Sequence, residues 1–301
     1  MALIVLVAFL CFFQRLTMVW NQNFPFDSWG HLYFIVSVKR QRTGPFKPIW
    51  TDVVGGGYYH YPLLTHWFIS LLPESILISR WVKVLNPIFE GVALLFCMLL
   101  SLWAGISPVT VSASGLLYIF TPMIFSKVGI GPTSYFSTRL YSELSTGMLL
   151  LLTFLPLPLD RSILILLVGL LVSYIALSSK FGLQMLFLVI IPAAFLSQKF
   201  YFLLAIIIGL TFSIFISKGV AIKIWREQWN HLLWYLSKVK TMPISDRNSF
   251  LNFKKAFSTS GLKEKVKNIA FLIVGKNSFT STILKFPILV AIPILLFNNN
   301  N

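Results

Sequence analysis

The fold of this chain is organised around FPFDSWGH, residues 24–31, and GGGYYHYPLLTHW, residues 55–67. Between residues 24 and 67 lie three of the four histidines and two of the nine acidic residues of the whole chain. Hydrophobic runs stand on both sides of this segment. Ionisable residues next to membrane spans are costly and indicate function. The segment is therefore typical of an enzyme that works at a membrane surface.

The composition places the chain among polytopic membrane proteins. Of its 301 residues, 56% are hydrophobic and 11% are charged, whereas soluble domains carry about 25% charged residues. Because a span in lipid must satisfy its own backbone hydrogen bonds, we expect an all-α fold. About eight runs approach the roughly 20 residues that cross a bilayer. They are residues 1–20, 84–104, 108–125, 140–158, 162–179, 182–198, 200–217 and 282–297.

The net charge of +16 favours a lipid partner. The sequence contains no nucleic-acid-binding motif, and its basic residues lie mostly between apolar runs and in one late segment. In residues 218–267 basic residues outnumber acidic ones by eleven to three, which suits an anionic lipid surface. The stretch from Ile222 to Tyr235 has tryptophans and leucines at helical spacing, a pattern typical of an interfacial amphipathic helix.

Asp27 and His31 are four residues apart, so in a helix they share a face. A carboxylate here can act as a general base on an acceptor hydroxyl, or hold a metal ion that binds phosphate. The alternative is a helix N-cap formed by Asp27 or, less favourably, by Ser28.

His60 and His66 form a second cluster with the aromatic residues around them. Either imidazole can donate to a phosphate, and the alternative is an aromatic belt at the membrane interface. The spacing of His31, His60 and His66 fits no compact metal motif, so we expect no histidine metal site.

Three more ionisable residues border membrane spans. Arg139 and Glu143 begin the run 140–158, where a functional role and a simple i,i+4 ion pair are both open. Lys180 lies between two apolar runs, where it either reaches toward lipid headgroups or faces a cavity and binds phosphate. If every long run crosses once, the loop with Asp27, the turns with Arg139 and Lys180, and the segment from 218 fall on one side.

The order of these motifs resembles the GT-C superfamily of integral-membrane glycosyltransferases, which includes protein O-mannosyltransferases, the aminoarabinose transferase of lipid A and the catalytic subunits of oligosaccharyltransferases. The residues Phe26 to Leu32 are similar to the family's acidic opening in the first large extracytoplasmic loop. The stretch Tyr59 to Leu63 resembles its x-Pro-Leu motif. The helix start at Arg139 and the turn from Ser178 to Gly182 also resemble family features.

The resemblance implies sugar transfer from a polyprenyl-phosphate donor at a cavity facing away from the cytoplasm. Asp27 would be the general base, with His31, His60, His66, Arg139, Glu143 and Lys180 binding substrate. The family's tandem acidic pair is absent at Asp27, so the sequence does not support a divalent-metal cofactor. The implied organisation is a catalytic membrane region over 1–217 with its loop at 21–75, a basic juxtamembrane segment at 218–281, and a last span with its tail at 282–301.

Two alternatives follow from the same residues. Basic loops normally mark the cytoplasmic side, and a cytoplasmic Asp27 loop would favour a soluble sugar donor. A transporter or lipid flippase would use Arg139, Glu143 and Lys180 as a substrate path, although no internal repeat supports it. Every reading makes the chain a multi-pass protein of the plasma membrane, or of the endoplasmic reticulum in a eukaryote.

Overall fold

The computed structural model describes residues 1–21, 23–24, 26–51, 57–59, 61–120, 136–238, 261–262 and 264–265. Contacts divide the chain into two compact units, one of residues 1–119 with 135–228, and the other of residues 120–134 with 229–301. The first unit holds nearly all of the described helices and strands. Its elements, with the whole of α6 and α13, are α1 (Ala2–Trp20), α2 (Phe26–Arg40), β1 (Ile49–Thr51), β2 (Gly57–Tyr59), α3 (Leu64–Ser70), α4 (Glu74–Leu77), η1 (Arg80–Val84), α5 (Leu85–Trp103), α6 (Pro108–Phe120), α8 (Arg139–Phe154), α9 (Arg161–Ser178), α10 (Lys180–Met185), η2 (Leu186–Ile190), α11 (Ile191–Leu196), α12 (Tyr201–Ile216) and α13 (Val220–Lys238).

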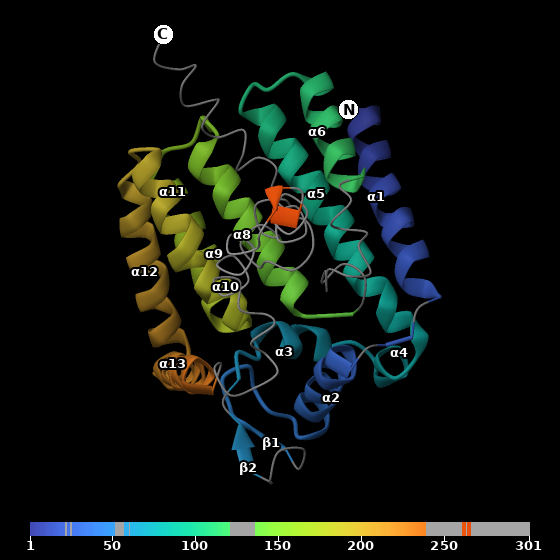
Figure 1. Ribbon diagram of the computed structural model, residues 1–301, viewed down its shortest axis with the longest axis vertical. Helices are drawn as coiled ribbons and strands as arrows, with labels where there is room; N and C mark the ends of the chain where they lie inside the picture. Colours follow the sequence, from blue (N-terminus) through green and yellow to red (C-terminus); the bar gives the residue numbers. More distant parts are fainter. Residues whose placement is uncertain are drawn as a thin grey trace. The chain divides into compact units, whose positions relative to one another are not determined.

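The long apolar helices form a row in which α1 packs on α5, α5 on α8, α8 on α9 and α9 on α12 (Figure 1). The α9–α12 contact is close because both helices present glycine there. A Cβ on Gly209 would lie 2.8 Å from Cβ of Val172. Ser173 Oγ donates to the Gly209 carbonyl at 2.6 Å. Small residues with a hydroxyl donor are a usual way for membrane helices to associate.

Three helices of the described part are long and apolar enough to cross a membrane, and a fourth is possible if a bent pair is one span. The three are Ala2–Trp20, Arg80–Trp103 and Arg161–Ser178, and the pair Tyr201–Ile216 with Val220–Asn230 bends by 111°. Pro108–Phe120 and Gly182–Leu196 are apolar but shorter. The protein is thus mostly helical with three or four candidate spans, fewer than the eight expected from hydropathy. The expected span 282–297 lies outside the described residues.

The segment expected as a long loop, residues 21–75, contains folded elements. It holds α2, the antiparallel pair β1–β2 in which Trp50 lies opposite Tyr58, and α3. Helices α2 and α3 pack together. Lys39 Nζ, near the end of α2, donates to the carbonyls of Ser70 and Leu72 at 2.9 and 2.8 Å, which satisfies acceptors at the end of α3. Hydropathy marked this segment only as polar, because its buried apolar residues, such as Leu32, Ile35 and Ile69, are interspersed with polar ones.

The expected run 182–198 is not a regular helix. It is α10, a π-helical turn η2, and α11, with Pro192 in the first turn of α11. Proline cannot donate a backbone hydrogen bond and crowds the preceding turn, which accounts for the widened turn before it. The expected amphipathic helix from Ile222 to Tyr235 is confirmed as part of α13, with Ile222 and Trp229 exposed.

Candidate active site

The turn before α8 is fixed against the first turn of α2. Ser28 is fully buried, and its Oγ donates to the carbonyl of Phe136 at 2.8 Å. Asn86 of α5 donates to the next carbonyl, that of Ser137, at 3.2 Å. Buried backbone acceptors need such partners. Ser28 therefore links α2 to α8 and does not act as the helix cap weighed from the sequence.

Two histidines predicted from the sequence meet beneath this turn. His31 Nδ1 of α2 lies 3.0 Å from His66 Nε2 of α3. Thr138 Oγ1 lies 3.0 Å from His31 Nδ1 and 3.3 Å from His66 Nε2. On the other side of the ring, Ser137 Oγ lies 3.3 Å from His31 Nε2. The two imidazoles and two hydroxyls form a hydrogen-bonded cluster, which we call the histidine cluster.

The environment of His66 keeps its imidazole neutral. Burial, and then the neighbouring His31, lower the pKa of His66 well below its ordinary value of 6.5, and the carbonyl of Pro62 offsets this only in part. At the 3.0 Å contact one nitrogen must donate and the other accept. Thr138 Oγ1 lies close to the same two nitrogens, so its hydroxyl can donate to whichever of them accepts.

Lys180 joins the cluster through an aromatic ring. Its Nζ lies 5.3 Å from the centroid of the Tyr61 ring, a cation–π distance. The Tyr61 ring meets the His66 ring edge-on with centroids 5.5 Å apart. Lys180 follows Ser179, whose side chain accepts from the N–H of Gly182 and so caps α10. The lysine is therefore turned toward the Tyr61 ring of the folded 21–75 segment, and that ring lies between the cation and His66.

Gly182 sets how closely α10 approaches its neighbours. A Cβ at this position would lie 2.7 Å from Cγ2 of Ile175 and 3.0 Å from Cβ of Ser142. Ile175 belongs to α9 and Ser142 to α8. Packing between three helices therefore requires a small residue at Gly182, two positions after Lys180. The sequence motif from Ser178 to Gly182 has this physical basis.

Arg139 and Glu143 form an ion pair with each other at the start of α8. This is the simple i,i+4 pair weighed from the sequence, and both side chains remain partly exposed. Arg139 directly follows Thr138 in the chain, and its backbone N–H donates to Ser137 Oγ of the histidine cluster at 3.1 Å. Because the two side chains are only 31% and 15% exposed, the Arg139 guanidinium is held against Glu143 in a partly buried pair.

The other two predicted site residues, Asp27 and His60, have side chains outside the described part of the structure. Asp27 lies in the first turn of α2, one residue before Ser28, while its side chain lies outside what the structure describes. His60 also lies outside the described residues. Within the described ranges, no three His, Cys, Asp or Glu side chains are grouped so that they could hold a metal ion.

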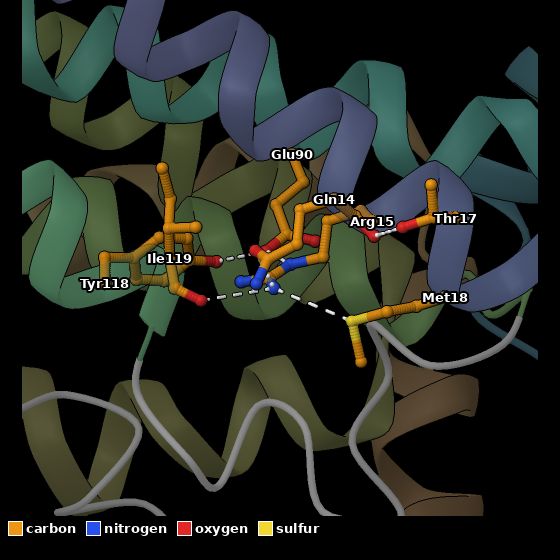
Figure 2. A network of polar contacts seen from close by, with 7 residues as sticks. All are labelled: Gln14, Arg15, Thr17, Met18, Glu90, Tyr118 and Ile119. Atoms are coloured by element: carbon orange, nitrogen blue, oxygen red, sulfur yellow. Dashed lines mark hydrogen bonds and ion pairs between the residues drawn. The ribbon is translucent and has the colours of Figure 1, made fainter.

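One polar network was missed in the sequence. Arg15 of α1 and Glu90 of α5 form a fully buried ion pair, Nε to Oε1, at 2.7 Å (Figure 2). Tyr118 of α6 donates its hydroxyl to the same carboxylate oxygen at 2.8 Å, and Arg15 Nη1 approaches the carbonyl of Ile119 at 3.5 Å. The available signal was an ionisable residue inside each of two apolar runs.

Comparisons with known proteins add no assignment. No family model matches the sequence, and no curated protein or solved structure matches it.

Proposed function

We propose that this protein is a membrane glycosyltransferase that moves a sugar from a polyprenyl-phosphate donor to a lipid, glycan or protein acceptor at the extracytoplasmic face. The proposal includes a topology of about eight spans in which the shorter apolar helices also cross. The observation that carries it is the meeting of three distant segments at one end of the helix row. Ser28 contacts Phe136, Thr138 contacts both histidines, and Lys180 contacts Tyr61.

The arrangement suits transfer from an anionic leaving group. As the glycosyl–phosphate bond breaks, negative charge builds on the departing phosphate, and cations placed beforehand stabilise it. In the proposal, Arg139, which follows Thr138 in the chain, and Lys180, which lies over the Tyr61 ring, supply two such cations. In the proposed mechanism the acceptor hydroxyl gives its proton to Asp27, and the hydroxyl oxygen attacks the anomeric carbon. In this mechanism the histidine cluster lies near the donor phosphate and carries a proton that the phosphate can receive.

The rival class, a transporter or flippase, is favoured by one observation. Arg15 and Glu90 are charged residues buried between two candidate spans, and such residues often mark substrate paths. Their side chains are however bonded to each other and to Tyr118, which also fits a structural link between α1, α5 and α6. Arg139 and Glu143, which a transporter would also use with Lys180, pair within one helix, and this pairing bears equally on both classes.

The experiment is the Asp27→Asn variant assayed for sugar transfer from polyprenyl-phosphate sugars in reconstituted membranes. Loss of a general base should lower turnover by about 10²- to 10⁴-fold, with an unchanged melting temperature. Asp160→Asn is the matched control. Asp160 caps α9 at the helix end opposite Ser178, and asparagine caps as well as aspartate. Transfer at the wild-type rate by Asp27→Asn would rule out the proposed base, and flux without transfer would favour the transporter.

A further inference from the structure

An open groove of about 790 Å³ runs between α2 and the stretch that joins α4 to α5. One side carries Trp29, Tyr33 and Arg40 of α2, and the other carries Ile78, Arg80 and Lys83. All of its lining belongs to the first unit. The groove is separate from the histidine cluster, and the predicted site residues whose side chains the structure describes do not line it.

The described residues that line the groove include three basic side chains and no acidic one. Arg40 is bonded to a carboxylate beside the groove, since its Nε and Nη2 donate to Glu74 at 3.0 and 2.6 Å. Arg80 and Lys83 also line the groove, and each places at its wall a positive charge of the kind that binds a phosphate.

Both cations are held in place by the end of α1. Lys83 Nζ donates to the carbonyl of Trp20 at 3.1 Å and lies 5.0 Å from the Phe24 ring centroid. The Arg80 guanidinium lies 4.7 Å from the Trp20 ring centroid. Aromatic faces and a carbonyl orient these groups with little loss of charge, so the pair is preorganised for a ligand.

The groove lies at the boundary of the candidate spans. One span ends at Trp20, and another begins at Arg80. Trp29 and Trp81 are 59% and 60% exposed here. Exposed tryptophan at the ends of spans is typical of the headgroup level of a membrane. A ligand at this level meets cations, aromatic rings and, from Leu32 and Leu77, a buried apolar floor.

We propose that this groove binds an anionic phospholipid, with Arg80 and Lys83 contacting the headgroup phosphate and the apolar floor receiving the start of the acyl chains. Cations alone would also suit a free phosphate, but the exposed aromatic and apolar lining is accounted for only by a lipid. Basic pockets at the ends of spans are a known mode of headgroup recognition. The site is distinct from the proposed donor site and does not depend on the proposed glycosyl transfer.

The test is lipid binding by the full chain in detergent, titrated with phosphatidylglycerol or phosphatidylcholine and followed by native mass spectrometry. The wild type should bind phosphatidylglycerol more tightly than phosphatidylcholine. The double variant Arg80→Gln with Lys83→Gln should weaken phosphatidylglycerol binding by about 10- to 30-fold, from the usual contribution of each basic residue near an anionic surface. Arg42→Gln with Lys47→Gln removes two exposed charges outside the groove and should leave binding unchanged.

A charge-preserving variant and a competition with free phosphate test the proposal further. The exchange Arg80→Lys with Lys83→Arg keeps both charges, so it should retain the lipid preference even if the glutamine variant folds poorly. Displacement of the lipid by millimolar inorganic phosphate would assign the groove to a free anion instead. Equal binding of the two lipids by the wild type, or equal losses in the groove and control variants, would also overturn the proposal.

Discussion

At the scale of single residues, the fold alters the chemistry of His66. Its pKa is lowered because the charged form would be desolvated and would face His31. In the unfolded chain the same imidazole titrates near its ordinary value of about 6.5. Below that pH the unfolded state binds a proton that the folded state does not bind, so stability falls as the pH falls.

We therefore expect His66 to contribute no pH dependence to the melting temperature of the wild type above pH 6.5. Below pH 6.5 its contribution should lower the melting temperature as the pH falls. The free energy of unfolding should change by at most about 1.4 kcal/mol per pH unit from this group. His66→Gln should be less stable at neutral pH, because a buried partner of His31 and Thr138 is altered, but it should lose this part of the acid dependence. Thermal unfolding in detergent between pH 5 and 8 measures both effects.

The control for His66 is His231→Gln, which removes a histidine of α13. This variant should keep the wild-type acid dependence. If His66→Gln and the wild type lost stability in parallel as the pH fell, another group would be responsible and His66 would not be held neutral.

At the scale of elements, the position of Lys180 depends on how tightly α10 packs against α8 and α9. Gly182→Ala places a methyl group against Ile175 and Ser142 at distances that packed atoms do not tolerate. Overpacking of this kind costs about 1–3 kcal/mol, against a gain of at most about 1 kcal/mol in helix propensity. We expect a lower melting temperature and, under the proposed function, a raised KM for the donor as Lys180 shifts.

Gly30→Ala is the matched control for Gly182→Ala. Gly30 lies in α2, and a Cβ there would meet nothing within 4 Å. Only the propensity gain then remains, so the melting temperature should stay level or rise. A stabilised Gly182→Ala variant would mean that α10 can move away from α8 at no cost.

The boundaries of most long helices could be predicted from the sequence, for a local reason. An apolar run bounded by Pro108 or Asp160 defines a helix by composition alone, and α6 and α9 begin there. The helices of the 21–75 segment were harder to predict, because Lys39 stabilises α3 through carbonyls that lie more than 30 residues away. The π-helical turn before Pro192 also depends on strain that hydropathy does not register.

The candidate site was predictable in its location but not in its contacts. Counting crossings predicts that the loop with Asp27 and the turns with Arg139 and Lys180 share one side, and the structure shows Ser28 in contact with Phe136 and Lys180 over the Tyr61 ring. Which histidine faces which depends on the angle between α2 and α3. The pairing of Arg15 with Glu90 joins residues 75 apart, and no local pattern specifies it.

At the scale of the whole molecule, the number of crossings determines which loops share a side of the membrane. The side of the membrane on which the turn at Gln198 lies depends on whether the chain has the three candidate spans or the proposed eight. With three spans, residues 179–200 stay on the side of the 21–75 segment. With eight spans, the segment 182–198 crosses, and the turn moves to the other side. The contact of Lys199 Nζ with the Leu155 carbonyl, at 3.5 Å, favours the second arrangement, because Leu155 follows the far end of α8.

Single cysteines in a Cys11→Ala, Cys97→Ala background test this count with an impermeant thiol reagent. The cysteines replace Lys47, Ser107 and Gln198, each of which is exposed. We expect Lys47→Cys to react in intact cells, and Ser107→Cys and Gln198→Cys to react only after the cells are opened. Reaction of Gln198→Cys together with Lys47→Cys would reduce the count to the three candidate spans. Protection of Lys47→Cys with reaction of the other two would keep eight spans but place the histidine cluster in the cytoplasm. There a polyprenyl-phosphate donor presented at the outer face could not reach Arg139 or Lys180, and a soluble sugar donor would be the one to assay.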